Sequence, residues 1–174
     1  VSREWSSDVC SSDLIRQNRI VAALTFFASF FIYFSTMAST VSYWDCGEFI
    51  ATAHTLGVPH PPGSPFFLLI GRVISMLPFH TDVAFRVNIL SPLSSALAVM
   101  LLYLVVVKVV THWRGKIENS TDAIIAFGGA AVGAMAFAFT DSHWFNAVEA
   151  EVYAISTFFT AIVVWLILLW SEKA

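Results

Sequence analysis

Four long apolar runs alternate with short polar segments along this chain. Residues 20–41, 87–107, 123–141 and 150–170 carry almost no charged side chains, and each run is long enough to cross the ~30 Å hydrocarbon core of a bilayer as a helix. Since the backbone polar groups of a span meet no water in lipid, they must be satisfied within the helix itself. The pattern therefore predicts an all-α integral membrane protein with four transmembrane helices.

The longest polar interruption, residues 43–86, lies between the first two runs and is expected to form an outer loop. Its prolines fix their own φ angles and lack an N–H donor, which predicts a stiff, extended turn over residues 58–65. The apolar stretch that follows, residues 66–77, is too short to span a bilayer. We expect it to form a re-entrant or interfacial helix.

Composition agrees with lipid as the solvent of this chain. Of the 174 residues, 57% are hydrophobic and 12% are charged, whereas a soluble domain carries about 25% charged residues. The formal net charge is −3, which gives no basis for a nucleic-acid partner, so we expect none.

The N-terminal segment has a different character. Residues 5–14 read WSSDVCSSDL, which resembles the translation of a sequencing adapter. Residues 1–14 are therefore predicted to be an artefactual or disordered tail, residues 15–174 the membrane domain, and the chain a fragment at both ends. With Cys10 set aside, Cys46 is the only cysteine, so no intrachain disulfide is expected.

The distribution of charge predicts how the helices are oriented. Basic residues gather on one side of the predicted spans, and the positive-inside rule places that side, with the N-terminus, in the cytoplasm. The acidic residues of the outer loop and of the segment before the fourth run then meet at one non-cytoplasmic boundary. The basic side holds Arg16, Arg19, Lys108, Arg114, Lys116 and Lys173, and the other holds Asp45, Glu48, Asp82, Asp141, Glu149 and Glu151, with Arg72 and Arg86.

Two carboxylates in the outer loop are the first candidates for chemistry. Asp45 and Glu48 lie one turn apart, so a helix that begins there places both on one face. A positioned carboxylate can remove a proton from an attacking hydroxyl. Asp45 could instead be a helix N-cap that bonds the Glu48 N–H, and Glu48 a solvated loop charge. The proline-rich turn either holds His60 beside these carboxylates or only breaks a helix.

Other polar residues near the outer boundary have two interpretations each. Arg72 is either a membrane anchor, with its guanidinium at the headgroup level, or a phosphate ligand. Glu149 and Tyr153 are expected on one helix face, with Glu151 pointing elsewhere. Alternatively, both glutamates simply interact with the positive end of the fourth helix dipole.

Three motifs in order along the chain carry a resemblance to a known family: WDCGEF at residues 44–49, HPPGSP at 60–65 and EAEVYA at 149–154. From residue 16 to 173 the chain resembles the start of an uncharacterised, Bacteroidetes-type bacterial membrane family. That family is similar to protein O-mannosyltransferases of the GT-C class. The resemblance implies that residues 15–174 are the N-terminal part of a GT-C-like fold.

The resemblance also implies an activity. GT-C enzymes transfer sugar from a polyprenyl-phosphate donor, so we expect transfer of a sugar such as mannose to a protein or glycan hydroxyl. The site would face the periplasm, in the inner membrane of a bacterium. Family members use an acidic residue in the first outer loop, and the matching residues are Asp45 and Glu48. Candidates for binding the donor or acceptor are His60, Arg72, Arg86, Glu149, Glu151 and Tyr153.

A metal and two other function classes stay open. Asp45, Glu48 and an outer glutamate are hard oxygen ligands that suit a divalent metal, but their spacing alone assigns none. A membrane transporter or flippase component also carries carboxylates and broken helices along its pathway. A structural membrane subunit would leave the His-Pro-Pro-Gly turn unexplained. The charges lie at the ends of the runs rather than at mid-depth, which favours a transferase that works at the membrane surface.

Overall fold

The computed structural model describes residues 2–115, 117 and 120–172, with side chains from residue 13 onward. Lys116 and Lys173, used above to orient the helices, and the side chain of Cys10 lie outside the described part. Helix α1 (Ser2–Thr36) includes residues 2–14, whose assignment as an artefactual tail stays a prediction.

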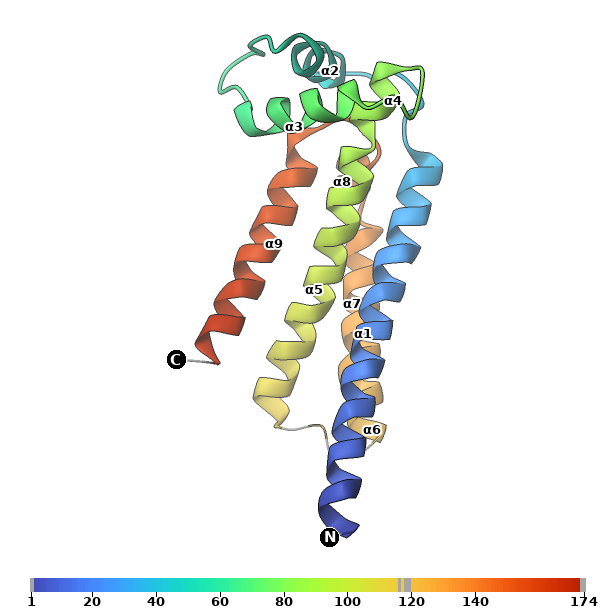
Figure 1. Ribbon diagram of the computed structural model, residues 1–174, viewed down its shortest axis with the longest axis vertical. Helices are drawn as coiled ribbons and strands as arrows, with labels where there is room; N and C mark the ends of the chain where they lie inside the picture. Colours follow the sequence, from blue (N-terminus) through green and yellow to red (C-terminus); the bar gives the residue numbers. More distant parts are fainter. Residues whose placement is uncertain (1, 116, 118–119, 173–174) are drawn as a thin grey trace.

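Four helices in the described part are long and apolar enough to cross a membrane, which confirms the predicted fold class. They run alongside one another through the length of the molecule (Figure 1). The first span lies within α1 and the fourth is α9 (Val152–Ser171). The second combines α4 (Val83–Asn88) with α5 (Leu90–Arg114), and the third combines α6 (Ser120–Ala123), η1 (Ile124–Gly128) and α7 (Gly129–Ala138).

A layer of shorter helices lies across one end of this bundle. Helix α2 (Cys46–Thr55) and helix α3 (Pro65–Met76) run across the ends of the long helices (Figure 1), as expected of interfacial helices. Residues 57–64 are not helical, and Pro65 opens α3 at a position where its missing N–H costs no helical bond. Helix α8 (Asp141–Ala147) connects α7 to α9.

Two clusters of buried side chains hold these parts together. The larger one joins α1, α5 and the third span, largely through alanines that allow close helix approach. Its two fully buried tyrosines satisfy their hydroxyls, since Tyr33 donates to the Ala138 carbonyl and Tyr103 to Asn18 Oδ1, each at 2.8 Å. The smaller cluster fixes the outer layer of α2, α3 and α4 onto the bundle.

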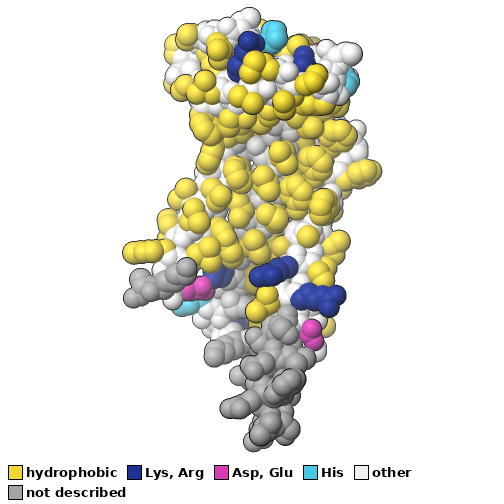
Figure 2. All heavy atoms as spheres, viewed as in Figure 1, with side chains coloured by type: hydrophobic (Ala, Val, Ile, Leu, Met, Phe, Trp, Pro, Cys, Tyr) yellow, Lys and Arg dark blue, Asp and Glu magenta, His cyan; other side chains and the backbone are white. Residues whose placement is uncertain are grey.

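The surface agrees with a membrane environment. Figure 2 shows hydrophobic side chains over the middle of the visible face, with Lys and Arg side chains above and below this zone. At the end opposite the short helices, Lys108 pairs with Glu172, and Arg114 Nη2 lies 3.9 Å from Asp122 Oδ1. The chain is an integral membrane protein with a polar boundary at each end.

Candidate functional site

Helix α2 presents two carboxylates to water because its other face is apolar. Cys46, Phe49, Ile50 and Ala53 recur at helical spacing and are buried against the outer layer. Glu48 lies on the exposed side of the helix, and Asp45 directly precedes its first residue. The sequence thus folds locally so that burial of one face leaves the acidic face open.

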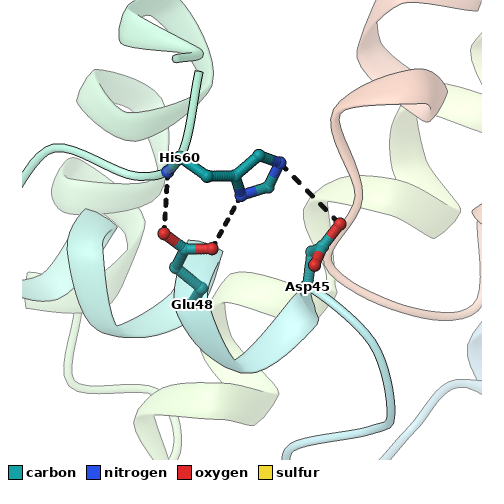
Figure 3. Close-up of side chains that lie close together, drawn as sticks. All are labelled: Asp45, Glu48 and His60. Atoms are coloured by element: carbon teal, nitrogen blue, oxygen red, sulfur yellow. Dashed lines mark hydrogen bonds and ion pairs between the residues drawn. The ribbon is translucent and has the colours of Figure 1, made fainter. Parts of the chain in front are cut away.

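His60 closes over these carboxylates from the proline-rich turn (Figure 3). Its backbone N–H donates to Glu48 Oε1 at 2.8 Å, and its ring Nδ1 lies 2.7 Å from Glu48 Oε2. Its other ring nitrogen, Nε2, lies 3.8 Å from Asp45 Oδ2. The structure therefore brings together Asp45, Glu48 and His60. This agrees with the interpretation that the proline-rich turn holds His60 beside the two carboxylates.

The contacts shift the pKa of both bonded partners. Hydrogen bonds from the His60 ring and backbone N–H lower the pKa of Glu48. The bond to Glu48 raises the pKa of His60, assisted by the negative charges of Glu48, Asp45 and Glu151. Both shifts favour the charged forms, a positive His60 beside a negative Glu48.

Asp45 keeps its carboxylate exposed to water at the start of α2, beside His60. It occupies the N-cap position of α2, but its side chain makes no capping hydrogen bond. Its side chain is 57% exposed. The preceding residue, Trp44, has φ 63°, a left-handed conformation that is unusual for a bulky residue and is more common at functional sites. The alternative of Asp45 as a helix N-cap is therefore right about its position, but the side-chain bond to the Glu48 N–H that it required is absent.

Glu149 and Glu151 are buried on the bundle side of the same site. Glu149 accepts a hydrogen bond from Ser42, and its other oxygen, Oε1, has no partner among the described residues. The pKa of Glu151 is raised by burial, and further by the negative charges of Glu149 and Asp45. Glu151 also interacts electrostatically with His60, so the second acidic segment reaches the first.

One expectation about this segment is wrong. Glu149 and Tyr153 do not share a helix face, because α9 begins only at Val152 and Glu149 lies in a bend. The backbone there is held from α4 and α5, since the Ala150 N–H donates to Asn88 Oδ1 and the Glu151 N–H donates to Ser91 Oγ. Tyr153 is 62% exposed, whereas both glutamates are buried.

Tyr153 instead lines an apolar groove between the second and fourth spans. The groove has a volume of about 440 Å³, and Leu102 of α5 and Val164 of α9 are among its walls. Its surface suits a hydrocarbon chain better than a free sugar.

The two outer arginines bond to backbone carbonyls. Arg72 donates to the carbonyl of His54, and Arg86 Nη1 donates to the carbonyl of Leu77 at 2.9 Å. Neither forms a salt bridge with a carboxylate within the described part of the chain. Both tie the outer layer together, and a phosphate-binding role for Arg72 or Arg86 stays a prediction.

Asp45, Glu48 and His60 are also the residues that would hold a metal ion. One ligand atom from each lies within 4.8 Å of the others. Two carboxylates and an imidazole suit a borderline divalent cation such as Zn²⁺ or Mn²⁺. The bond between Nδ1 and Glu48 already occupies one ring nitrogen, so Nε2 is the nitrogen left for such an ion.

Three polar residues that support the site were missed from the sequence. Ser42 and Ser91 look like ordinary serines there, and Asn88 is one amide in a long apolar run. A buried amide at the end of a membrane span is costly unless it is bonded, and that cost was the available signal for Asn88.

Fold and site together define an integral membrane protein with a carboxylate and imidazole cluster at one end of its bundle. The chain belongs to the family of the protein O-mannosyl-transferase TMEM260 N-terminal domain, which matches residues 45–174. The similarity to O-mannosyltransferases expected from the three motifs is thus confirmed, while the bacterial source and the GT-C fold stay predictions.

Two relatives carry the same name. The chain is 30% identical to protein O-mannosyl-transferase tmem260 of Dictyostelium discoideum over 166 residues, covering 94% of this chain and 18% of the relative. It is 31% identical to protein O-mannosyl-transferase TMEM260 of Mus musculus over 159 residues, covering 90% of this chain and 20% of the relative. The chain thus spans about a fifth of the length of these relatives. No solved structure matches it.

Proposed function

We propose that this protein is a membrane glycosyltransferase that uses a polyprenyl-phosphate sugar, such as polyprenyl-phosphate mannose, as donor. The acceptor is a hydroxyl of a protein or glycan on the non-cytoplasmic side. Family membership supports the reaction class, and the exposed Asp45 carboxylate, unused as a helix cap and 3.8 Å from His60 Nε2, is the observation that carries the proposal.

Asp45 is the general base of the proposed reaction. The acceptor oxygen attacks the anomeric carbon, the bond from that carbon to the phosphate oxygen breaks, and the hydroxyl proton passes to Asp45. The bonding electrons leave with the polyprenyl phosphate, which departs as an anion and needs little acid assistance. One base is sufficient for inversion at this carbon.

His60 and Glu48 act as a unit beside the base. The Glu48 carboxylate accepts two hydrogen bonds from His60 and so fixes the direction of its ring. A protonated His60 near Asp45 also offers a cation to the departing phosphate. Arg72 and Arg86, on the same outer layer, are further candidates for contact with the donor phosphate.

The donor lipid accounts for the position of the site. A polyprenyl phosphate has its charged group at the membrane surface and its chain in the hydrocarbon core. The exposed side chains of Asp45, Glu48 and His60 provide the polar part. The apolar groove beside Tyr153 is chemically suited to the isoprenoid chain.

A transporter is the competing class, and the charges of the spans argue against it. Asp, Glu, Lys and Arg side chains in the described spans lie toward their ends, as Lys108 and Arg114 of α5 do. A pathway for ions or sugars needs polar groups at mid-depth.

The test is transfer from radiolabelled polyprenyl-phosphate mannose to a serine- and threonine-containing peptide, in membranes that contain the protein. We expect Asp45→Asn to lower the rate on the order of 100-fold or more, the usual value of a positioned base. Asp141→Asn, which alters an exposed carboxylate of α8, is the matched control and should retain the rate. Full activity of Asp45→Asn with normal insertion would exclude Asp45 as the base.

A further inference from the structure

Asn88 makes four polar contacts where the outer layer joins the bundle. It is fully buried at the joint between α4 and α5. Its Nδ2 donates to the carbonyls of Ala38, at 2.8 Å, and Thr40, at 3.0 Å. Its Oδ1 accepts from the Ala150 N–H at 3.1 Å and from the Cys46 thiol at 3.7 Å. The donors and the acceptor of the amide are thus all used.

The segments bonded by Asn88 are the ones that carry the candidate catalytic groups. Cys46 follows Asp45 directly, and Ala150 stands between Glu149 and Glu151. The segment after Thr40 contributes Ser42, the donor to Glu149. One side chain therefore links both acidic segments, which lie far apart in the sequence.

We infer that Asn88 is a positioning residue that fixes Asp45 relative to the second acidic segment. The inference rests on the proposed function, because it assigns Asn88 a part in that reaction. A misplacement of about 1 Å in a reacting group can cost on the order of 100-fold in rate, so a single buried amide that fixes both segments has a direct effect on turnover.

The backbone before Asp45 shows why such fixing is needed. Trp44 adopts a positive φ, and the residue is 83% exposed, so packing of the indole does not hold this conformation. Asn88 bonds Thr40 on one side of it and Cys46 on the other. Strained conformations persist only where the surroundings determine them, and Asn88 supplies that constraint on both flanks.

The local sequence accounts for the end of α4 at Asn88. Pro92 lacks an N–H, so it cannot donate to the carbonyl of residue 88, and the helix breaks between α4 and α5. Ser91, one turn beyond Asn88, accepts from the Glu151 N–H at 3.4 Å. Asn88 and Ser91 together present a short polar face of the second span to the backbone of Ala150 and Glu151.

The test compares Asn88→Leu with Asn18→Leu, both in a Cys10→Ser background. Asn18 also bridges two helices, through Tyr103 Oη, but it lies in α1 outside the site. The first readout is maleimide labelling of Cys46, which is 0% exposed in the structure. The second is kcat and donor KM of sugar transfer.

We expect Asn88→Leu to speed the labelling of Cys46 and to lower kcat on the order of 100-fold, while donor KM changes little. The Asn18→Leu control should keep Cys46 protected and kcat near the parent value. Protection of Cys46 together with an unchanged kcat in Asn88→Leu would overturn the inference. If Asn88→Leu does not insert, Asn88→Ser is judged by the same two readouts.

The two proposals fail in different ways. If the parent protein shows no transfer, the glycosyltransferase proposal fails, and Cys46 labelling alone decides whether Asn88 orders the segment: rapid labelling supports it and protection overturns it. If Asp45→Asn abolishes transfer but Asn88→Leu does not, only the positioning role is overturned.

Discussion

His60 bonds Glu48 through its backbone N–H and its ring, which couples the order of the proline-rich turn to two protonation states. Because the pKa of His60 is raised in the folded protein, the bond of His60 stabilises the turn fully at a pH below the ordinary histidine pKa of 6.5. This stabilisation is lost as the pH rises through the raised pKa. Because the pKa of Glu48 is lowered, the Glu48 carboxylate stabilises the turn fully at a pH above the ordinary glutamate pKa of 4.5. This stabilisation is lost as the pH falls through the lowered pKa. The pair stabilises the turn most fully between those ordinary values.

We expect Glu48→Gln to return the pKa of His60 toward its ordinary value, because the largest cause of the shift is the bond to the Glu48 carboxylate. The measurement is an NMR titration of the His60 ring in nanodiscs. Glu172→Gln, at the opposite end of the molecule, is the control and should leave the titration unchanged. An identical His60 pKa in Glu48→Gln and the parent would show that the bond is absent in solution.

At the scale of the elements, the outer layer depends on the close approach of α2 and α3. A Cβ atom at Gly71 of α3 would lie 2.9 Å from the Cβ of Ala53 in α2, a distance that requires the helices to move apart. Both residues belong to the buried part of this layer. Gly71 is therefore needed for its lack of a side chain rather than for backbone freedom.

Gly71→Ala should destabilise the outer layer by about 1–3 kcal/mol, the usual cost of overpacking. Hydrogen exchange of the α2 amides measures this directly. Gly133→Ala in α7 is a matched control, because a Cβ there meets no atom within 4 Å. It should leave exchange in α2 unchanged. Equal protection of α2 in the two variants would mean that α2 and α3 are not packed as described.

Sequence patterns predicted the elements whose structure depends on one local property of the chain. Apolar length predicted the four spans, and the prolines predicted the turn that presents His60. The bend at Glu149 was not predictable in this way, because no proline or glycine marks it and tertiary bonds to Asn88 and Ser91 hold the backbone there. The bonding of Arg72 to a neighbouring carbonyl was equally hidden, since it depends on how α2 and α3 pack.

At the scale of the whole molecule, two acidic segments far apart in the sequence lie at one end of the bundle. Four alternating spans predict this meeting, and the electrostatic interaction of Glu151 with Asp45 and His60 agrees with it. The apolar zone in Figure 2 separates this end from the end that holds Lys108 and Arg114. The compartment that the site faces is a prediction from the basic residues.

The proposed site requires both acidic segments to meet water on the non-cytoplasmic side. The most direct test is labelling of single cysteines by a membrane-impermeant maleimide, with Cys10 and Cys46 replaced by serine. We predict that Glu48→Cys and Asp141→Cys react from the non-cytoplasmic side only, and Arg114→Cys from the cytoplasmic side only. Reaction of positions 48 and 141 from opposite sides, or of position 48 from the cytoplasm, would contradict the proposed site.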